Sequence, residues 1–387
     1  MSRILIITNR LIVGGPSVHL RHIVKHFSKK HKLLLVFGEA SKGELSMEEE
    51  FKKFGVEMIK ISSFRRSFNP IQDIKFAGEL KRIIKDFKPD IVHTHTSKPG
   101  YVGRYVAAKL NVKRIIHTYH GLIFKEYFSK VYSSIVVNMD RVLAKKTDFI
   151  VALSKLQKNE IVDTYKIGNY DKVNIIPLAI SKTKDSYNTK LAKSYRQKWN
   201  IEDDTMLIAQ VGRLADVKDN SLMIERYCNV RKNSKNKSML FIVGDGELKS
   251  HLIDLAQSLH LKVAIGEPIE GADVVFTSWC KNLDELYSAM DLLVLTSKSE
   301  GTPFSIIEAQ VSGTAVFVPN IGGIGDMVKE NETAYLYNSI DEFERKLTLL
   351  INDRSLVNKM GENAAIFAAK KYNMEDMLTS YEELYKI

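Results

Sequence analysis

The sequence is poor in cysteine, in proline and in long apolar runs. Its two cysteines, Cys228 and Cys280, cannot form a disulfide framework or a cysteine zinc site, and they suit a reducing cytosol. Eight prolines in 387 residues, with 44% hydrophobic and 27% charged residues, exclude collagen-like and disordered chains. No apolar run approaches the ~20 residues of a membrane span. The apolar start of the chain stops at Asn9, which is too short for a signal peptide and predicts a first strand.

Acidic residues are scarce in the first half of the chain. Residues 1–180 contain 32 Lys and Arg against 16 Asp and Glu, whereas the remainder contains 25 against 30. The net charge of +11 therefore comes entirely from the first half. Such a one-sided balance points to an anionic partner, and nucleic acid, a membrane surface and a phosphorylated substrate are the candidates.

Short apolar runs alternate with amphipathic stretches over the whole length. Strands that are apolar on both faces and alternate with helices predict parallel sheets covered on two sides. The expected helices include residues 16–30, 71–87 and 100–110. The expected strands are residues 3–8, 33–37, 56–61, 91–94, 114–118, 149–153 and 173–176, and then 206–211, 240–243, 272–276, 292–296 and 315–318. Residues 177–200 are rich in Lys, Ser and Asn and predict a linker, so we expect two doubly wound α/β domains in tandem.

Ligands of such sheets bind beyond the carboxyl ends of the strands, so the residues that follow each strand are the candidates for chemistry. Gly14 and Gly15 follow the first strand and open a helix, where backbone N–H groups can approach a phosphate or a sugar. A plain tight turn is the alternative. The pair is not a G-x-G-x-x-G motif, which argues against a nicotinamide site.

Histidines gather after the fourth and fifth strands. His93 and His95 end the fourth strand, and His117 and His120 lie at the end of the fifth. A zinc site is one interpretation, but no carboxylate is spaced to complete the ligand set. Hydrogen-bonded histidines are the commoner case, and one of them can meet a substrate hydroxyl.

The second half contains two fixed cations after its first strand, Arg213 and Lys218, which suit a diphosphate. A solvated loop pair is the alternative. Two Gly-rich turns, at residues 243–246 and 320–326, follow later strands, and we interpret the first as structural.

The most specific segment is residues 299–309. We expect a helix that starts with Thr302 as N-cap and Pro303 as its first residue. The N-terminus of this helix would receive phosphate. Glu300 lies in the preceding loop. Glu308 lies about two turns into the helix, where an inward carboxylate needs a partner such as a ribose diol.

Together these segments resemble the retaining glycosyltransferases of family 4, and the resemblance runs over nearly the whole chain. The family's Gly-Gly loop, H-G-x-x-F segment, G-R-L…K element and E-x7-E signature all have counterparts in this order. The matching residues are Gly14 and Gly15; His120, Gly121 and Phe124; Gly212, Arg213, Leu214 and Lys218; and Glu300 and Glu308. The resemblance implies the GT-B fold, in which two Rossmann-like doubly wound parallel-sheet domains face a central cleft.

The resemblance also implies how the chain is divided. Residues 1–180 would form an acceptor-binding domain and residues 181–371 a nucleotide-sugar-binding domain. The terminal helix, residues 372–387, would pack back on the first domain.

Four segments narrow the resemblance to bacterial enzymes of O-antigen, capsule and exopolysaccharide assembly: residues 92–98, 217–220, 276–279 and 300–303. Those enzymes commonly use UDP-sugars, often N-acetylated, and an acceptor linked to a lipid diphosphate. Two departures are Ala179, where the family often has Gly, and Thr277-Ser278, which replaces a Leu-Gly pair before the base-binding loop.

By resemblance, the reaction is a front-face displacement with retention. We expect no cofactor and no metal ion. The chain has no Asp-x-Asp motif to hold a metal, and its nearest approach is Asp203-Asp204. The expected catalytic residues are His120, Glu300, Arg213 and Lys218. The expected acceptor contacts are His93, His95, Lys98 and Arg104. The expected donor contacts are Gly14, Gly15, Arg213, Lys218, Trp279, Glu300, Gly301, Thr302, Pro303, Phe304, Ser305 and Glu308. We expect a cytoplasmic protein that is peripheral at the inner face of the cell membrane.

Two other functions remain as alternatives. A sugar-nucleotide epimerase of the same fold would need acid and base carboxylates, and the first half offers no suitably placed pair. A basic nucleic-acid-binding module would show aromatic residues interleaved with Lys and Arg, and residues 64–68 are the only such stretch.

Overall fold

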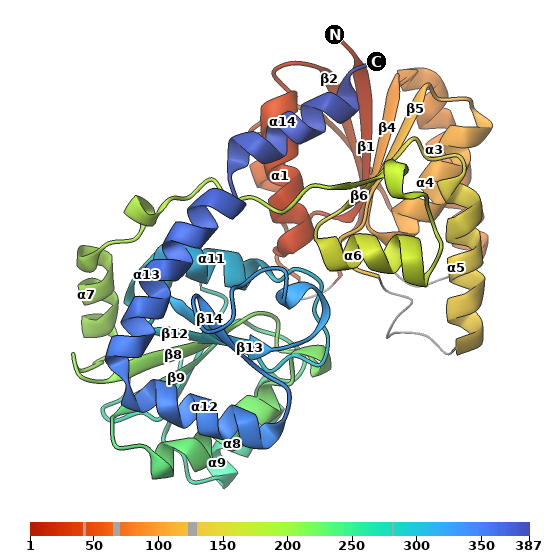
Figure 1. Cartoon of the computed structure of the whole chain (residues 1–387). Coiled ribbons are helices and arrows are strands. Elements are labelled where there is room, and N and C mark those ends of the chain that lie inside the picture. Colours follow the sequence, from red (N-terminus) through yellow and green to blue (C-terminus); the bar gives the residue numbers. More distant parts are fainter. Residues whose placement is uncertain (42–43, 65–69, 123–129, 281) are drawn as a thin grey trace. The chain divides into compact units, whose positions relative to one another are not determined.

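The computed structural model describes residues 1–41, 44–64, 70–122, 130–280 and 282–387. The chain divides into two compact units, which are Met1–Ala179 with Met374–Ile387, and Ile180–Asn373. Each unit is a parallel sheet with helices on both faces (Figure 1). Ile123 and Phe124 of the expected H-G-x-x-F segment, and residues 65–68 of the aromatic and basic stretch, lie outside the described residues.

The first unit contains a seven-stranded parallel sheet in the order β3-β2-β1-β4-β5-β6-β7. Its strands are β1 (Arg3–Arg10), β2 (Lys32–Gly38), β3 (Glu57–Ile61), β4 (Ile91–His95), β5 (Arg114–Thr118), β6 (Phe149–Ala152) and β7 (Val173–Ile175). Its α-helices are α1 (Gly15–Phe27), α2 (Glu48–Lys52), α3 (Pro70–Phe87), α4 (Ser97–Lys109), α5 (Lys130–Ala144), α6 (Lys155–Asn159) and α14 (Met374–Tyr385).

The second unit repeats the plan with the order β10-β11-β9-β8-β12-β13-β14. Its strands are β8 (Met206–Val211), β9 (Ser238–Val243), β10 (Val263–Ile265), β11 (Val274–Ser278), β12 (Leu292–Val294), β13 (Ala315–Pro319) and β14 (Ala334–Tyr337). Its α-helices are α7 (Thr189–Lys198), α8 (Asn220–Asn233), α9 (Lys249–Ser258), α10 (Leu283–Ala289), α11 (Phe304–Ser312), α12 (Ile340–Asn352) and α13 (Arg354–Lys371).

The core of the first unit follows from the alternation of side chains along β1. Ile4 and Ile6 pack in the cluster that includes α1 and α14, whereas Leu5 and Ile7 pack in the cluster that includes α3 and α4. Successive side chains of a strand point to opposite faces, so a strand buried on both sides must be apolar throughout. This explains why the strands appear in the sequence as continuous apolar runs.

The last helix of the chain belongs to the first unit. Four side chains of α14 join the cluster around Ile4 and Ile6, and they are Met377, Tyr381, Leu384 and Tyr385. Burial of each large apolar side chain contributes about 1.5–3 kcal/mol, so this return is a substantial part of the unit's stability.

The expected α/β class with two parallel, doubly wound sheets is confirmed. Two strands were missed, β10 and β14, and both are short edge strands. The stretch expected as a linker was partly wrong, because it contains α7. Asn188 caps this helix by accepting from the Leu191 N–H, and the buried Trp199 at its end lies 5.4 Å from the Phe241 ring. Within the described residues, no helix is both long and apolar enough to span a bilayer.

Candidate functional site

The loop after β8 is tied to the end of β12 by buried polar side chains. Gln210 donates through its Nε2 atom to the Lys218 carbonyl and to the Thr296 hydroxyl, at 3.0 Å in both cases. The Thr296 hydroxyl donates in turn to the Asp219 carbonyl at 2.8 Å. Since buried polar groups are costly unless paired, this network fixes the backbone that carries Lys218.

Lys218 and Glu300 contact each other directly. The Lys218 ammonium lies 2.5 Å from Glu300 Oε1, and the Ser297 hydroxyl donates to the same oxygen at 2.6 Å. The Glu300 side chain is only 8% exposed. Two residues that the sequence assigns to different parts of a donor, the diphosphate and the sugar, are therefore brought together at one point.

The Gly-rich loop after β13 supports Glu300 from its backbone side. Gly322 has φ of 51°, and a Cβ atom there would lie 1.8 Å from the Glu300 carbonyl oxygen. Only glycine permits this approach without displacing the Glu300 loop. The turn after β9 supports the loop after β8 in the same way, because a Cβ on Gly244 would lie 1.9 Å from the Gly212 carbonyl oxygen.

Arg213 is the loosely held cation of this region. Its side chain is 45% exposed, and its guanidinium lies 4.0 Å from the exposed Glu247 carboxylate. An exposed pair at this distance contributes little to stability. Arg213 is therefore available to an anionic ligand at small cost to the fold.

The helix of the E-x7-E segment starts one residue later than expected. Pro303 is the N-cap with ψ of 124°, which is extended, so α11 begins at Phe304. The expected Thr302 cap was wrong, because the structure has no side-chain cap bond there. The first turn of α11 contains no acidic residue, so its free N–H groups retain their affinity for an anion.

Glu308 has a protein partner that the sequence did not indicate. The Tyr287 hydroxyl donates to Glu308 Oε2 at 3.0 Å. Burial, and then the Glu308 carboxylate, hold the pKa of Tyr287 well above its usual value, so the hydroxyl stays a donor. The Tyr187 ring lies 6.4 Å from that of Tyr287, and its buried hydroxyl has no hydrogen-bond partner among the described residues. Trp279, another expected donor contact, follows β11 and is partly exposed.

In the first unit, the expected Gly-Gly loop opens a helix that contributes to a histidine cluster. Gly14 is the N-cap of α1, and this helix carries the buried His19. The His19 ring lies 5.3 Å from the His120 ring and 6.3 Å from the His95 ring, while the His93 and His95 rings are 4.1 Å apart. Three strand or helix ends thus converge here, and His19 was not among the predicted residues.

Burial keeps these imidazoles neutral. It lowers the pKa of His120 to about 4 and that of His93 to about 3, and it also lowers the pKa values of His19 and His95. His95 Nδ1 lies 3.2 Å from His120 Nε2, and the buried His95 Nε2 has no partner in the described part of the chain.

Both rings are neutral, so one imidazole of this pair donates to the other. We assign the donation to His95 Nδ1, with His120 Nε2 as the acceptor. His120 then carries its own proton on Nδ1. The arrangement makes His120 a neutral hydrogen-bond donor to whatever lies at its Nδ1 atom.

The other expected acceptor residues lie inside the unit. His93 is fully buried between the Tyr385 hydroxyl at 2.7 Å and the Thr118 hydroxyl at 2.8 Å. Arg104 is fully buried and pairs with Asp140, and the almost buried Lys98 pairs with Asp73. Their burial argues against direct contact with an acceptor and gives His93 and Arg104 a structural role. Within the described ranges, no group of three or more His, Cys, Asp or Glu side chains is arranged to hold a metal ion.

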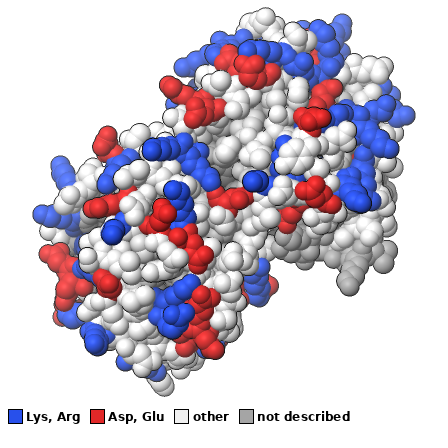
Figure 2. All heavy atoms as spheres, viewed as in Figure 1, with Lys and Arg blue, Asp and Glu red and all other residues white. Residues whose placement is uncertain are grey.

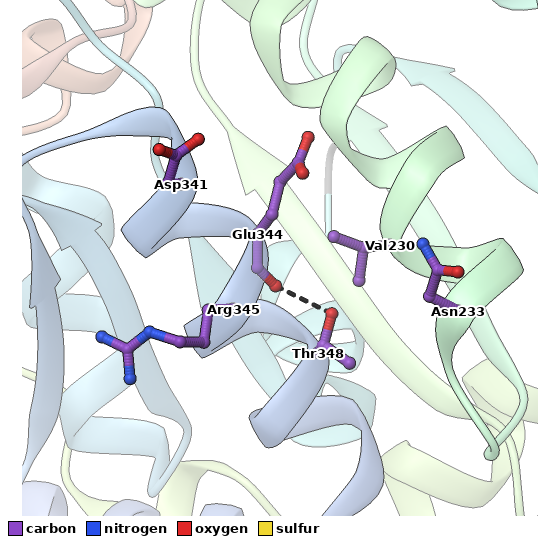
Figure 3. A pocket seen from close by; sticks show the side chains of 6 residues that line it. All are labelled: Val230, Asn233, Asp341, Glu344, Arg345 and Thr348. Carbon is purple, nitrogen blue, oxygen red and sulfur yellow. Dashed lines mark hydrogen bonds between the residues drawn. The ribbon is translucent and has the colours of Figure 1, made fainter.

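A cavity of about 380 Å³ lies between α8 and α12 (Figure 3). Its lining residues all belong to these two helices, and none of them is among the expected site residues. The Thr348 hydroxyl in its wall donates to the Glu344 carbonyl of its own helix. This cavity is therefore separate from the strand-end residues and offers no comparable set of converging groups.

Residues 13–184 match the glycosyltransferase family 4 domain, and residues 192–367 match the domain of the glycosyl transferases group 1. A curated relative is the UDP-Gal:alpha-D-GlcNAc-diphosphoundecaprenol alpha-1,3-galactosyltransferase of Escherichia coli, which is 27% identical over 324 residues, or 83% of this chain and 81% of that protein. Another is the capsular polysaccharide biosynthesis glycosyltransferase CapM of Staphylococcus aureus, at 24% identity over 345 residues and 87% of each protein.

Solved structures resemble the chain over its whole length. HepE of Anabaena, in complex with UDP and glucose, has a TM-score of 0.81 at 16% identity, and the match covers 99% of each chain. WaaG, a glycosyltransferase involved in lipopolysaccharide biosynthesis, has a TM-score of 0.77 at 16% identity over 100% of each chain.

Proposed function

Because the chain belongs to the glycosyltransferases with a family 4 domain followed by a group 1 domain, we propose that it is a retaining enzyme that transfers a sugar from a UDP-sugar to a saccharide or lipid-diphosphate-linked acceptor. Its similarity to a diphosphoundecaprenol-dependent galactosyltransferase and to a capsular polysaccharide enzyme supports a role in cell-surface polysaccharide synthesis. The similarity of the whole chain to solved structures confirms the GT-B fold.

The second unit is the proposed site of the nucleotide sugar. The observation that carries the proposal is the Lys218–Glu300 contact, which joins the loop after β8 to the loop just before α11. Lys218, Arg213 and the free N–H groups of α11 would neutralise the leaving diphosphate, since preorganised charges stabilise a developing charge most effectively. Glu300 would hold sugar hydroxyls and Glu308 the ribose, with the donor loops at residues 301–305 between them.

Binding of the donor would break the existing contact between Lys218 and Glu300. In the structure the Lys218 ammonium is balanced by Glu300 Oε1, so a bound diphosphate would compete with a carboxylate for the same cation. Sugar hydroxyls would then donate hydrogen bonds to Glu300 in place of the Lys218 ammonium. Exchange of this kind keeps both buried charges satisfied before and after binding.

The first unit is the proposed site of the acceptor, and it supplies His120. As a neutral donor at Nδ1, His120 suits a sugar oxygen near the anomeric centre rather than a general base. No carboxylate base is assigned, and in a front-face displacement the leaving phosphate accepts the proton of the attacking hydroxyl. One relative acts on a diphosphoundecaprenol-linked acceptor, and the basic first half of the chain supports a peripheral position at the cytoplasmic face of the membrane.

A donor screen tests the proposal. UDP-, GDP- and ADP-sugars are offered to the whole chain without acceptor, and slow hydrolysis and thermal stabilisation are measured. We expect a UDP-sugar to be hydrolysed and to raise Tm, and Lys218→Met to abolish both effects. Stabilisation by GDP- or ADP-sugars alone would contradict the UDP assignment, and equal hydrolysis by Lys218→Met would remove Lys218 from the diphosphate site.

A further inference from the structure

Helix α5 is apolar on two faces. Val136, Val137, Leu143 and Ala144 are buried in a core cluster with β6. On the outer face, Ile135, Met139 and Val142 are 52%, 43% and 63% exposed. These three positions recur at four and three residues, so they form one row along the helix. A helix covered on one face only is normally polar on the other, and this row has no partner among the described residues.

The neighbouring helix also has an exposed aromatic side chain. Helix α4 packs against α5, and its Tyr105 is 53% exposed. The Lys109 ammonium lies 5.9 Å from the centre of the Tyr105 ring. We call Tyr105, Ile135, Met139 and Val142 the α4–α5 face. Tyrosine and lysine both combine an apolar body with a polar tip, so they suit the edge of an apolar surface where it meets water.

The exposed charges at the ends of α4 and α5 are mostly basic. Helix α4 contains no acidic residue, and the only acid of α5 is Asp140, which is fully buried in its pair with Arg104. The exposed charged residues at the ends of the two helices are Lys109, Lys113, Lys145, Lys146 and Asp148. In the space-filling view, Lys and Arg side chains are prominent on the upper right of the molecule, with fewer Asp and Glu side chains among them (Figure 2).

We propose that the α4–α5 face docks on an anionic lipid bilayer, with its apolar row in the boundary between headgroups and acyl chains and its lysines on the headgroups. The inference extends the peripheral part of the proposed function and rests on it. Amphipathic helices bind bilayers in this way when apolar side chains and cations share one side. A protein partner fits less well, because lysine is depleted at protein–protein interfaces.

Vesicle sedimentation of the whole chain tests the proposal. The variant Ile135→Ser/Met139→Ser/Val142→Ser is compared with Ile340→Ser/Leu349→Ser/Ile366→Ser, which removes three exposed apolar side chains from the second unit. On vesicles of phosphatidylglycerol and phosphatidylcholine, we expect the first variant to bind at least about tenfold more weakly, because three apolar side chains no longer enter the bilayer. The control should bind like the unaltered protein, and both should melt at similar temperatures.

A charge variant tests the second half of the proposal. Lys109→Gln/Lys145→Gln/Lys146→Gln should bind more weakly and lose part of the salt dependence, since each removed cation no longer contacts anionic headgroups. Equal binding of the serine variant and the unaltered protein would overturn the proposal, as would equal binding to pure phosphatidylcholine. If the serine variant instead dissociated an oligomer in size-exclusion chromatography and kept its vesicle affinity, the face would be a self-interface.

The vesicle assay needs no donor and no turnover. Rates on a water-soluble acceptor report the proposed transferase activity separately, and we expect the serine variant to keep them. Loss of vesicle binding with normal soluble turnover would support the docking face, whereas absent turnover in every variant would contradict the proposed function and leave the docking result intact.

Discussion

Lys218 and Glu300 illustrate how closely the expected donor residues are held. Their 2.5 Å contact leaves Arg213 as the exposed cation of the same loop, with a weak partner at 4.0 Å. A residue in this state contributes to ligand binding more than to folding.

Arg213→Ala is therefore expected to lower kcat/KM by about 10²–10³, because loss of one preorganised contact to a leaving group costs about 3–4 kcal/mol. Tm should be unchanged. The matched control is Arg226→Ala, which removes an arginine that pairs with Glu344 at 3.3 Å in the same unit. Steady-state rates and thermal melts of both variants measure this, and near-normal turnover by Arg213→Ala would take it out of the diphosphate site.

Tyr287→Phe should weaken nucleotide binding, although Tyr287 is not itself one of the proposed donor contacts. The Tyr287 hydroxyl orients Glu308, so its loss frees the carboxylate. One hydrogen bond is worth about 0.5–1.5 kcal/mol, which predicts a rise of about 2- to 10-fold in KM for the UDP-sugar.

Tyr227→Phe is the control for Tyr287→Phe, since the Tyr227 hydroxyl is equally buried and donates to the Ser238 carbonyl at 2.9 Å. Both variants should lose about 1 kcal/mol of stability, and only Tyr287→Phe should change KM. Equal KM values in the two variants would show that Tyr287 does not act through Glu308.

The buried histidines predict a loss of stability in acid. The unfolded chain binds protons on histidine below about pH 6.5, whereas burial lowers the pKa of His22 and of His120 to about 4 and that of His93 to about 3. The unfolded state therefore holds more protons between these values, and stability falls as the pH falls through this window.

For the fully buried His93, each pH unit in that window costs up to about 1.4 kcal/mol. Urea unfolding at about pH 7 and about pH 5 should show a clear decrease in the free energy of unfolding at the lower pH. Equal stability at the two values would mean that the histidines are not neutral and buried.

At the scale of elements, close glycine contacts hold the loops together with the side-chain bonds. Gly322→Ala places a Cβ atom 1.8 Å from the Glu300 carbonyl oxygen, so the Glu300 loop must move. We expect a loss of at least about tenfold in kcat/KM, since small displacements of positioning groups are costly.

Gly78→Ala is the control for Gly322→Ala, because Gly78 lies within α3 and a Cβ there would meet nothing within 4 Å. Alanine is about 1 kcal/mol more favourable than glycine inside a helix, so this variant should be stable and fully active. Full activity of Gly322→Ala would show that the Glu300 backbone tolerates a shift.

The elements themselves were largely predictable because central parallel strands are continuous apolar runs. The edge strands β10 and β14 were missed, since runs of three or four residues carry too little pattern to recognise. The helix α7 was taken for linker because its lysines dominate the composition, while tertiary packing of Trp199 decides its structure.

The candidate site was predictable only where a residue lies in a motif. Glu300, Glu308, Arg213 and Lys218 follow strands in recognisable segments. The Tyr287–Glu308 bond joins residues that are 21 positions apart, and no spacing rule indicates it. Likewise, the burial of Arg104 depends on Asp140, a partner that lies on another helix.

At the scale of the whole molecule, the basic excess of the chain lies in its first half. The first unit takes back the last helix of the chain, whose Tyr385 hydroxyl bonds to His93. The basic excess of the first half fits an anionic surface or substrate, whereas the second half contains more acidic than basic residues. We propose that protein cations and a helix N-terminus, without a metal ion, neutralise the leaving diphosphate in a retaining transfer.

The most direct test of that claim is the anomeric configuration of the product, read from NMR coupling constants in a reaction with an α-linked UDP-sugar and excess EDTA. We expect undiminished turnover and an α-linked product, because Arg213, Lys218 and the N-terminus of α11 would supply the charge that a metal otherwise provides. A β-linked product would contradict retention. Turnover that is lost in EDTA and restored by Mg²⁺ would contradict the metal-free site.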